Sequence, residues 1–466
     1  MELDPVLLAR LQFAFTVTFH IIFPTFTIGL SAYIATLLVL WVGTGQDRYQ
    51  RLARFWTRIF AVSFAMGVVS GIVLSYQFGT NWSRFSVFAG NIVGPLIGYE
   101  VLTAFFLEAT FLGVMLFGWG RVPRWLQVFS AIMVALGTMI SAFWVLAANS
   151  WMHTPTGHEV VDGVAMPLDW WAIIFNPSFP YRFTHMLNAS FLTAGFVVLA
   201  VGARYLLADR HPEQARTMIK MSIALLAVLA PLQLLLGDLH GLNTLKHQPI
   251  KIAAMEAHWD SHEPVDFHIF AWPDEKAEKN HWALSIPNAG SLILTHRLNG
   301  LIIGLKDVAP RNRPPVKTVF FAFRIMLVIG FFMIAAAVIG AWLLWRGILF
   351  ETRWYLRIVA QSWWTGFVAV IAGWVVTESG RQPWVVQGML RTADATSPLS
   401  ASMVLTSLAL FVLVYAIVFA MGIYYINRLI ARGPQGRAVE PPDQGSPLRP
   451  LSSAHDAGRE ALAPGS

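Results

Sequence analysis

Nine long apolar runs constrain the fold of this chain more than any other feature of its sequence. Each run is long enough for an α-helix to cross the hydrocarbon core of a bilayer, which needs about 20 residues. A helix also satisfies its own backbone hydrogen bonds, which lipid cannot do. We therefore predict an all-α, polytopic membrane helical bundle of about nine transmembrane helices, at approximately residues 11–41, 55–78, 93–119, 125–148, 184–207, 218–239, 317–345, 355–378 and 401–430.

The composition agrees with a membrane protein. Of the 466 residues, 56% are hydrophobic and only 13% are charged, which is far from the balance of a soluble domain. The net charge of +7 does not indicate a nucleic-acid partner, because the basic residues lie between the apolar runs. The chain has no cysteine, which excludes thiolate-bound iron–sulfur clusters, covalently attached c-type haem and cysteine-ligated copper or zinc. Residues 1–10 lack a basic stretch, so we expect the first run to be retained as a span.

Basic residues in the short connections predict the orientation, because cytoplasmic loops carry an excess of Lys and Arg. The second and fourth connections offer only Arg84 and Arg182. The other short connections and the end of the chain hold the larger set, namely Arg48, Arg51, Arg54, Arg58, Arg121, Arg124, Arg204, Arg210, Arg216, Lys220, Arg346, Arg353, Arg357, Arg428, Arg432 and Arg437. We predict that the N-terminus lies outside and the C-terminus inside.

This orientation divides the chain into functional regions. Residues 1–430 form the predicted membrane domain, and residues 240–316 form a long outer loop within it. Loops of that length are usually functional or disordered. Residues 431–466 are rich in Pro, Gly, Ser and Ala, and we expect them to be a disordered cytoplasmic tail.

Two acidic residues lie inside the third apolar run. Glu100 and Glu108 are eight residues apart, which places them roughly 12 Å apart along a helix and on broadly the same side. A charge at membrane depth costs at least about 2.5–3.5 kcal/mol, so a buried Glu needs a partner, a proton or water. The pair indicates a proton path or the wall of a site.

The other polar residues of the spans converge on the outer half of the membrane. His20, His185, Met326 and Glu378 all fall there once the orientation is applied. Taken singly, each has an ordinary explanation: a hydrogen-bonded histidine, a core methionine, or an interfacial ion pair between Glu378 and Arg381. Taken together, two His, a Met and a Glu at one depth suit axial ligation of haem iron.

The outer loop contains a predicted short helix after Pro249. Lys251 and Glu256 lie in it five residues apart, so a helical salt bridge is not expected and a solvated face is the simple interpretation. The loop histidines show no compact metal-binding spacing, and we expect them at the surface; they are His247, His258, His262, His268, His281 and His296.

Several motifs occur in register along most of the chain. They are Arg10 to Ala14, Gly79-Thr80-Asn81-Trp82, the run with Glu100 and Glu108, Lys251 to Trp259, Phe321-Ala322-Phe323-Arg324-Ile325-Met326, and Gly380-Arg381-Gln382-Pro383-Trp384. In this order they resemble subunit I of cytochrome bd quinol oxidases, over about residues 11–391.

The resemblance implies a set of haem ligands. His185 and Met326 match the axial ligands of a low-spin haem b, with Arg324 beside it. His20 and Glu378 match the ligands of the two oxygen-reducing haems, which are a haem b and a haem d or a further haem b. Trp374 and Arg381 match residues of the cofactor site.

The resemblance also implies roles in proton and quinol chemistry. Glu100 and Glu108 match acidic residues of proton delivery, and Lys251 and Glu256 match quinol-binding residues of the outer loop. Two departures stand out: the loop lacks the long insertion of some relatives, and Ser75 occupies a position where some relatives have an acid.

The resemblance implies a respiratory quinol:oxygen oxidoreductase that generates a proton-motive force without copper. It would lie in the bacterial plasma (inner) membrane among lipid, with a subunit II, small single-span subunits as further candidates, ubiquinol or menaquinol, and oxygen, but no nucleic acid. Two alternatives are a cytochrome b electron conduit that does not bind oxygen, and an ion-coupled transporter that uses Glu100 and Glu108.

Overall fold

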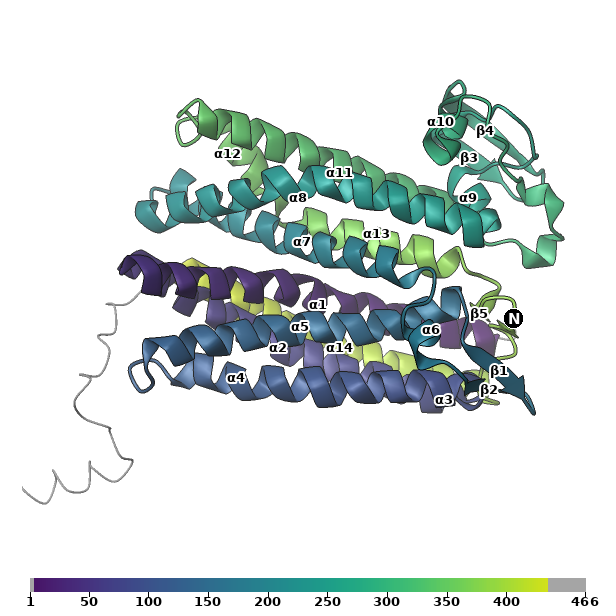
Figure 1. The fold of residues 1–466 in the computed structure, drawn as a ribbon, viewed down its shortest axis with the longest axis horizontal. Coiled ribbons are helices and arrows are strands. Elements are labelled where there is room, and N and C mark those ends of the chain that lie inside the picture. Colours follow the sequence, from purple (N-terminus) through teal and green to yellow (C-terminus); the bar gives the residue numbers. More distant parts are fainter. Residues whose placement is uncertain (1–3, 435–466) are drawn as a thin grey trace, which may run out of the picture.

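The computed structural model describes residues 4–434, which form a bundle of long, nearly parallel helices (Figure 1). Within that range, eight helices are long and apolar enough to cross a membrane, and a bent pair makes a ninth candidate. The predicted all-α bundle is confirmed. Most of the predicted tail, residues 431–466, lies outside the described residues.

The spans follow the predicted order and extend beyond the predicted limits at most ends. The third span is continuous but contains a π-helical turn, η1. In chain order the spans are α1 (Pro5–Thr44), α2 (Asp47–Thr80), α3 (Ser83–Glu100) with η1 (Val101–Phe105) and α4 (Phe106–Phe117), α5 (Arg124–His153), α7 (Phe179–Leu207), α8 (Pro212–His247), α11 (Val316–Trp345) and α14 (Ala401–Arg432).

Local sequence signals set several helix boundaries. The side chain of Asp4 caps α1 by accepting a hydrogen bond from the Val6 N–H, and Pro5 follows at the first helical position. Gly45 ends α1 in the left-handed conformation at φ 68°, where a residue without a Cβ is favoured. Pro212 and Pro249 begin α8 and α9 in the same way as Pro5.

The predicted span at residues 355–378 is broken. Its residues form α12 (Arg353–Ala360), the 3₁₀ turn η4 (Ser362–Trp364) and α13 (Thr365–Ser379), and the two parts are bent by 41°. Helix α12 is amphipathic: Tyr355, Leu356 and Val359 are buried, while Trp354 and Arg357 are exposed. It lies at the end of the bundle opposite the outer loop (Figure 1).

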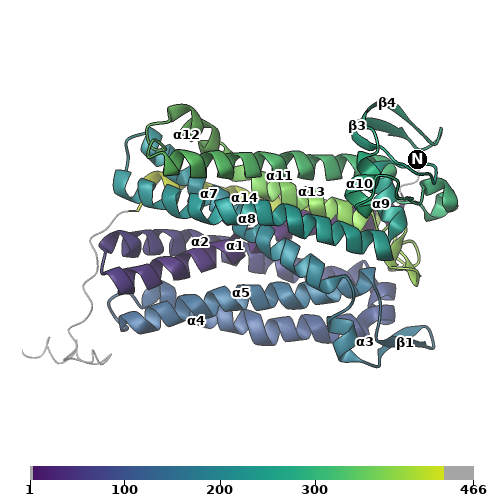
Figure 2. The ribbon, with the colours of Figure 1, turned by 45° about the horizontal axis from the view of Figure 1, so that its top comes forward.

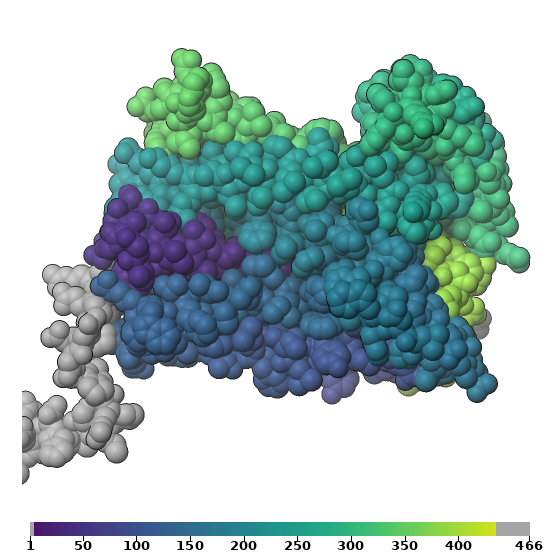
Figure 3. All heavy atoms as spheres, in the orientation of Figure 1, coloured from purple at the N-terminus to yellow at the C-terminus, as the bar shows by residue number. Residues whose placement is uncertain are grey.

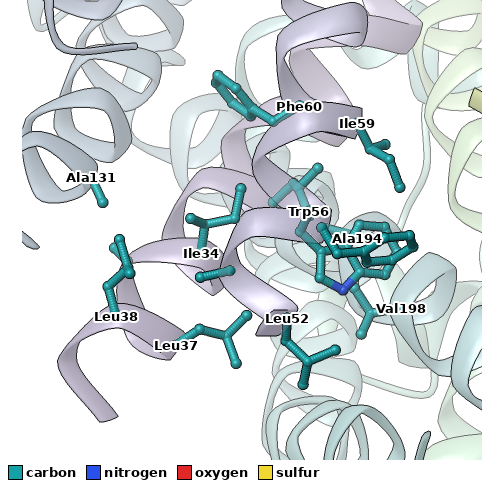
Figure 4. Packing of buried hydrophobic residues seen from close by; sticks show 14 of the residues in the cluster. Ile34, Leu37, Leu38, Leu52, Trp56, Ile59, Phe60, Ala131, Ala194 and Val198 are labelled. Atoms are coloured by element: carbon teal, nitrogen blue, oxygen red, sulfur yellow. The ribbon is translucent and has the colours of Figure 1, made fainter. Parts of the chain in front are cut away.

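A dense apolar core fills the half of the bundle toward the predicted cytoplasmic face. One buried apolar cluster joins Trp56 of α2 with Leu37 and Leu38 of α1 and with Ala194 and Val198 of α7 (Figure 4). Small residues bring the backbones together, as is common between membrane helices. At Gly29 a Cβ would lie 2.6 Å from the carbonyl oxygen of Ser190.

The other end of the bundle carries the structures that lie outside the spans (Figures 1 and 2). The outer loop forms a lobe that rises above the helices (Figure 3), and its predicted short helix is confirmed as α9. The three antiparallel hairpins at this end were not predicted. The elements are β1 (His158–Val161), β2 (Val164–Pro167), α6 (Trp170–Ile174), α9 (Pro249–Glu256), β3 (Phe267–Asp274), β4 (Lys279–Ile286), α10 (Ala289–Thr295), η2 (Leu305–Asp307), η3 (Pro310–Asn312), β5 (Trp384–Val386) and β6 (Leu390–Arg391).

Candidate functional site

A large cavity occupies the outer half of the bundle. Its volume is about 1720 Å³, which exceeds the roughly 300–1,000 Å³ of an ordinary small-molecule pocket. The four predicted iron ligands and both predicted quinol residues line it, together with Glu100, Glu108, Trp374 and Arg381. These predicted site residues therefore share one internal space, whose walls include α1, α2, α3, α4, α5, α7, α8, α9, α11 and α13. Arg324, predicted to lie beside the low-spin haem, is not among the lining residues.

His20 reaches the cavity from the middle of α1. Its Nδ1 lies 3.0 Å from the hydroxyl of Ser70 on α2. Gly71 leaves the room that the imidazole needs, because a Cβ at that position would lie 3.1 Å from Cε1 of His20. The hydrogen bond and the missing side chain together hold the ring against α2 at the edge of the cavity.

His185 and Met326 enter the cavity from α7 and α11. Nε2 of His185 lies 3.0 Å from the side-chain nitrogen of Gln233 on α8, and its ring lies 5.6 Å from that of His240. A Cβ on Gly373 would lie 3.1 Å from the sulfur of Met326. Glycine thus leaves space beside the methionine, as it does beside His20.

Glu378 lies in the last turn of α13 within a cluster of polar side chains. Its carboxylate pairs with Arg381, accepts a hydrogen bond from the amide of Asn149 at 3.1 Å, and lies 3.2 Å from Nε2 of His153. Arg182 approaches to 4.0 Å and hydrogen-bonds Asn149. Sequence reasoning expected the pair with Arg381 as one option but missed Asn149 and His153.

The cluster carries more positive than negative charge. Arg182, Arg381 and Lys251 are buried around the single carboxylate of Glu378. Nε of Arg182 and both Nε and Nη1 of Arg381 have no hydrogen-bond partner. Buried, unpaired donors of this kind are costly, so this wall of the cavity is suited to a ligand that presents further carboxylates.

Lys251 projects from α9 into the same cluster. Its ammonium nitrogen lies 3.1 Å from Nδ1 of His153, and the residue is only 5% exposed. The expectation of a solvated helix face is therefore wrong. Burial lowers the pKa of Lys251 well below its ordinary value, and the charges of Arg182 and Arg381 lower it further. His153 thus lies between Lys251 and Glu378.

Glu256 occupies the other end of α9 and is also buried. Its carboxylate lies 2.6 Å from the guanidinium of Arg324, which also donates to the carbonyl oxygen of His268 at 2.7 Å. Burial raises the pKa of Glu256, although Arg324 and His268 oppose this shift. The loop histidines are not all at the surface as expected, because His258 is 3% exposed.

Glu100 and Glu108 both face α5. The hydroxyl of Ser141 donates to Glu100 at 2.8 Å. Glu108 is buried, one of its oxygens has no partner, and a Cβ on Gly137 would lie 2.6 Å from its Cγ. The π-helical turn η1 separates the two residues, and such turns are frequent at functional sites. Both side chains line the cavity, and their role there stays a prediction.

The candidate iron ligands do not form a bare metal site. Within residues 4–434, no three His, Asp or Glu side chains come together in a way that could hold a metal ion. Haem needs only one or two protein ligands for each iron. Separate His, Met and Glu side chains around a large cavity therefore fit haem better than they fit a mononuclear metal.

Comparison with known proteins gives consistent matches over almost the whole chain. The family described as Cytochrome bd terminal oxidase subunit I matches residues 8–434. Cytochrome bd ubiquinol oxidase subunit 1 of Bacillus subtilis (strain 168) is 36% identical over 443 residues, covering 92% of this chain and 94% of that protein. Cytochrome bd-II ubiquinol oxidase subunit 1 of Escherichia coli (strain K12) is 31% identical over 511 residues, covering 95% and 99%.

A solved structure shares the fold. The bd oxidase from Geobacillus thermodenitrificans superimposes with a TM-score of 0.85 at 29% identity, covering 92% of this chain and 99% of that chain. Haem cofactors and a quinol substrate follow from the family, and so does the place of this multi-pass membrane protein in a multi-subunit oxidase of the respiratory chain. The chain belongs to the cytochrome bd terminal oxidase subunit I family and is a subunit of a quinol oxidase.

Proposed function

We propose that the chain oxidises quinol at the outer face of the membrane and reduces oxygen to water at a pair of haems in the outer half of the bundle. The protons for water would come from the cytoplasm, so that the reaction generates a proton-motive force. One observation carries this proposal: the candidate ligands of four helices and the two buried loop residues Lys251 and Glu256 line one cavity of about 1720 Å³.

The residues present fit haem. His185 and Met326 would hold a low-spin haem b, and His20 and Glu378 would hold a haem b and a haem d, or two haems b. When bound, haem iron supplies electron transfer and oxygen activation. The unpaired donors of Arg182 and Arg381 would bind carboxylates at the edges of these haems, with Trp374 as a further wall of the site.

Lys251 and Glu256 would bind quinol from the loop side. Glu256 would accept a hydroxyl proton, and its pairing with Arg324 at 2.6 Å stabilises the ionised form that a base requires. Burial lowers the pKa of Lys251, so its amine would orient a quinol oxygen by hydrogen bonding rather than by charge alone. Protons released here would leave on the outer side.

Glu108 and Glu100 would carry protons toward the haems from the inner side. Both line the cavity, and Ser141 holds Glu100 by a 2.8 Å hydrogen bond. The unpartnered oxygen of Glu108 is free to exchange a proton with water. A dense apolar core lies on the inner side of these residues. Another subunit would therefore supply the part of the proton path between the cytoplasm and Glu108.

His153 would couple the quinol residues to the oxygen-reducing haems. Its two ring nitrogens lie 3.1 Å from Lys251 and 3.2 Å from Glu378. It therefore fixes the position of a loop residue relative to a candidate haem ligand. This is a positioning role, because His153 contacts the side chains of Lys251 and Glu378 and would not itself bind haem or quinol.

The partners would be those of a bacterial inner-membrane oxidase. We expect a subunit II, with small single-span subunits as further candidates, and ubiquinol or menaquinol as the electron donor. Exposed apolar side chains on α14 offer a face for such a subunit or for lipid, including Leu410, Leu413, Ile417 and Met421.

The spectrum of a ligand variant tests the proposal. Met326→Leu should change the absorption of the low-spin haem and leave the carbon monoxide spectrum of the reduced oxygen-site haems largely intact. A wild-type complex that binds no carbon monoxide would instead support the electron conduit. If Met326→Leu leaves the low-spin spectrum unchanged, the assignment of this ligand is wrong.

A further inference from the structure

A second pocket lies at the opposite end of the bundle from the loop, between the start of α2 and the end of α4. Its volume is about 240 Å³, and it is lined by Arg54, Thr57, Arg58, Leu116, Phe117 and Trp119. This is below the roughly 300 Å³ at which ordinary ligand pockets begin. The space suits a compact headgroup rather than a whole substrate molecule.

Two like charges converge on this pocket. Arg54 and Arg58 lie one turn apart on α2, a spacing at which like charges repel and destabilise a helix. The neighbouring Arg51 has an acidic partner, Glu213, at 3.3 Å. Within residues 4–434 neither Arg54 nor Arg58 forms an ion pair with a carboxylate. An anion between the two guanidinium groups would remove the repulsion.

Aromatic rings hold one of these arginines in place. The guanidinium carbon of Arg54 lies 5.2 Å from the ring centroid of Trp119, and Trp119 lies 6.2 Å from Trp41. Arg124 in turn lies 5.0 Å from the ring of Trp41. A guanidinium that contacts a ring with its face keeps its N–H edge available for oxygen atoms.

The surroundings identify the source of the anion. The pocket lies on the face that the basic connections predict to be cytoplasmic, and its wall continues onto Phe117, which is 70% exposed. A basic pocket between helix ends at this surface is the usual site for an anionic lipid headgroup. Free phosphate would not need the apolar side chains of Leu116 and Phe117, whereas an acyl chain would pack against them.

We propose that this pocket binds the phosphate of an anionic phospholipid, whose acyl chain runs along the exposed side of α4. The excess of arginine in cytoplasmic loops explains why basic residues are present. It does not explain why two of them share a pocket with a tryptophan and an apolar exit. The pocket shares no lining residue with the cavity, so it does not depend on the proposed haem and quinol roles.

The test compares lipid binding by the purified oxidase complex and its variants. The probes are dioleoylphosphatidylglycerol, dioleoylphosphatidylcholine and inorganic phosphate, measured by native mass spectrometry and by thermal unfolding. The double variant Arg54→Gln/Arg58→Gln should bind phosphatidylglycerol about 30-fold more weakly, because both guanidinium groups that would contact the phosphate in the pocket are lost. The variant Arg54→Lys/Arg58→Lys, which keeps the charge, should recover part of this affinity.

A matched control comes from α14. Arg428 and Arg432 have the same spacing, are exposed near the same face, and form no carboxylate pair among the residues described. Arg428→Gln/Arg432→Gln should retain wild-type affinity for phosphatidylglycerol. An equal loss in this control, equal binding of phosphatidylcholine, or equal stabilisation by inorganic phosphate would each overturn the proposal.

Discussion

The two halves of the bundle use similar helices for different purposes. In the inner half, Trp56 and Leu37 have no exposed surface, and Gly29 brings α1 against α7. In the outer half, His20 and Gly71 lie on the continuations of α1 and α2 but border a cavity of about 1720 Å³. Close packing in one half therefore contrasts with a cavity in the other, whose mainly apolar walls carry a few polar side chains.

The difference shows where this bundle can accommodate cofactors. A void in a packed core forfeits contacts and is costly. Here none of the buried residues of the inner core lines the cavity, so the outer half can be shaped for cofactors. Substitutions should accordingly lower stability in the inner half and change chemistry in the outer half.

The largest effect is expected at the quinol residue Glu256. Glu256→Gln should slow quinol oxidation roughly 10²–10⁴-fold, because the variant lacks a general base. Haem content and oxygen reduction with an artificial electron donor should stay near wild type. Glu263→Gln, an exposed position in the same loop, is the matched control and should retain normal rates. Quinol oxidation at the wild-type rate in Glu256→Gln would show that the loop assignment is wrong.

Substituting one tryptophan in each half of the bundle should lower the free energy of unfolding by different amounts. Trp56→Ala should lower the free energy of unfolding by about 3–5 kcal/mol, as expected for a large buried ring, and the folded fraction should keep its haem spectrum. Trp374→Ala, on the cavity wall, should instead shift the haem spectrum with a smaller loss of stability. If thermal unfolding shows that both variants are destabilised equally, the proposed difference between a packed inner half and a cofactor-binding outer half is wrong.

Two glycine-to-alanine substitutions, each adding one methyl group, compare the inner and outer halves in the same way. Gly29→Ala places a Cβ 2.6 Å from a backbone oxygen and should cost about 1–3 kcal/mol of stability. Gly71→Ala places a Cβ 3.1 Å from the ring of His20 and should lower occupancy of the His20 haem while unfolding changes little. Gly90→Ala meets no atom within 4 Å and serves as control. A normal haem content in Gly71→Ala would contradict the placement of His20.

The pH dependence of quinol oxidation should give the smallest effect. Burial raises the pKa of Glu256, so the carboxyl keeps its proton to a higher pH than an exposed Glu does. The ionised base forms only above that pKa, and the rate should therefore rise with pH through this range. A plot of the quinol oxidation rate against pH should show this rise in the wild type and lack it in Glu256→Gln. If the rise with pH persists in the variant, it reports the titration of a group other than Glu256, and the prediction is wrong.

Much of the site could be predicted from sequence because lipid makes polar residues conspicuous. His185, Met326 and Glu378 are unusual inside apolar runs, and the orientation placed them at one depth. All three line one cavity, while their common depth and their roles as iron ligands remain predictions. The helical bundle followed from the same apolar runs.

Other parts depend on tertiary contacts that no local pattern shows. His153 was missed because the predicted span stopped at residue 148, whereas α5 continues to His153 itself. The polar residues Asn149 and Ser150, which extend the run on the same helix, were the available signal. Gly71 and Gly373 reveal their importance only when the neighbouring His20 and Met326 are in place.

The haem content of the purified complex tests the central claim most directly. We expect an intense Soret band, and pyridine extraction should yield one haem for the His185–Met326 pair and one each for His20 and Glu378. The variants His20→Ala and Glu378→Ala should each lose a haem other than the low-spin one. A folded complex without a Soret band, or variants that keep every haem, would contradict the proposal that this cavity is a haem site.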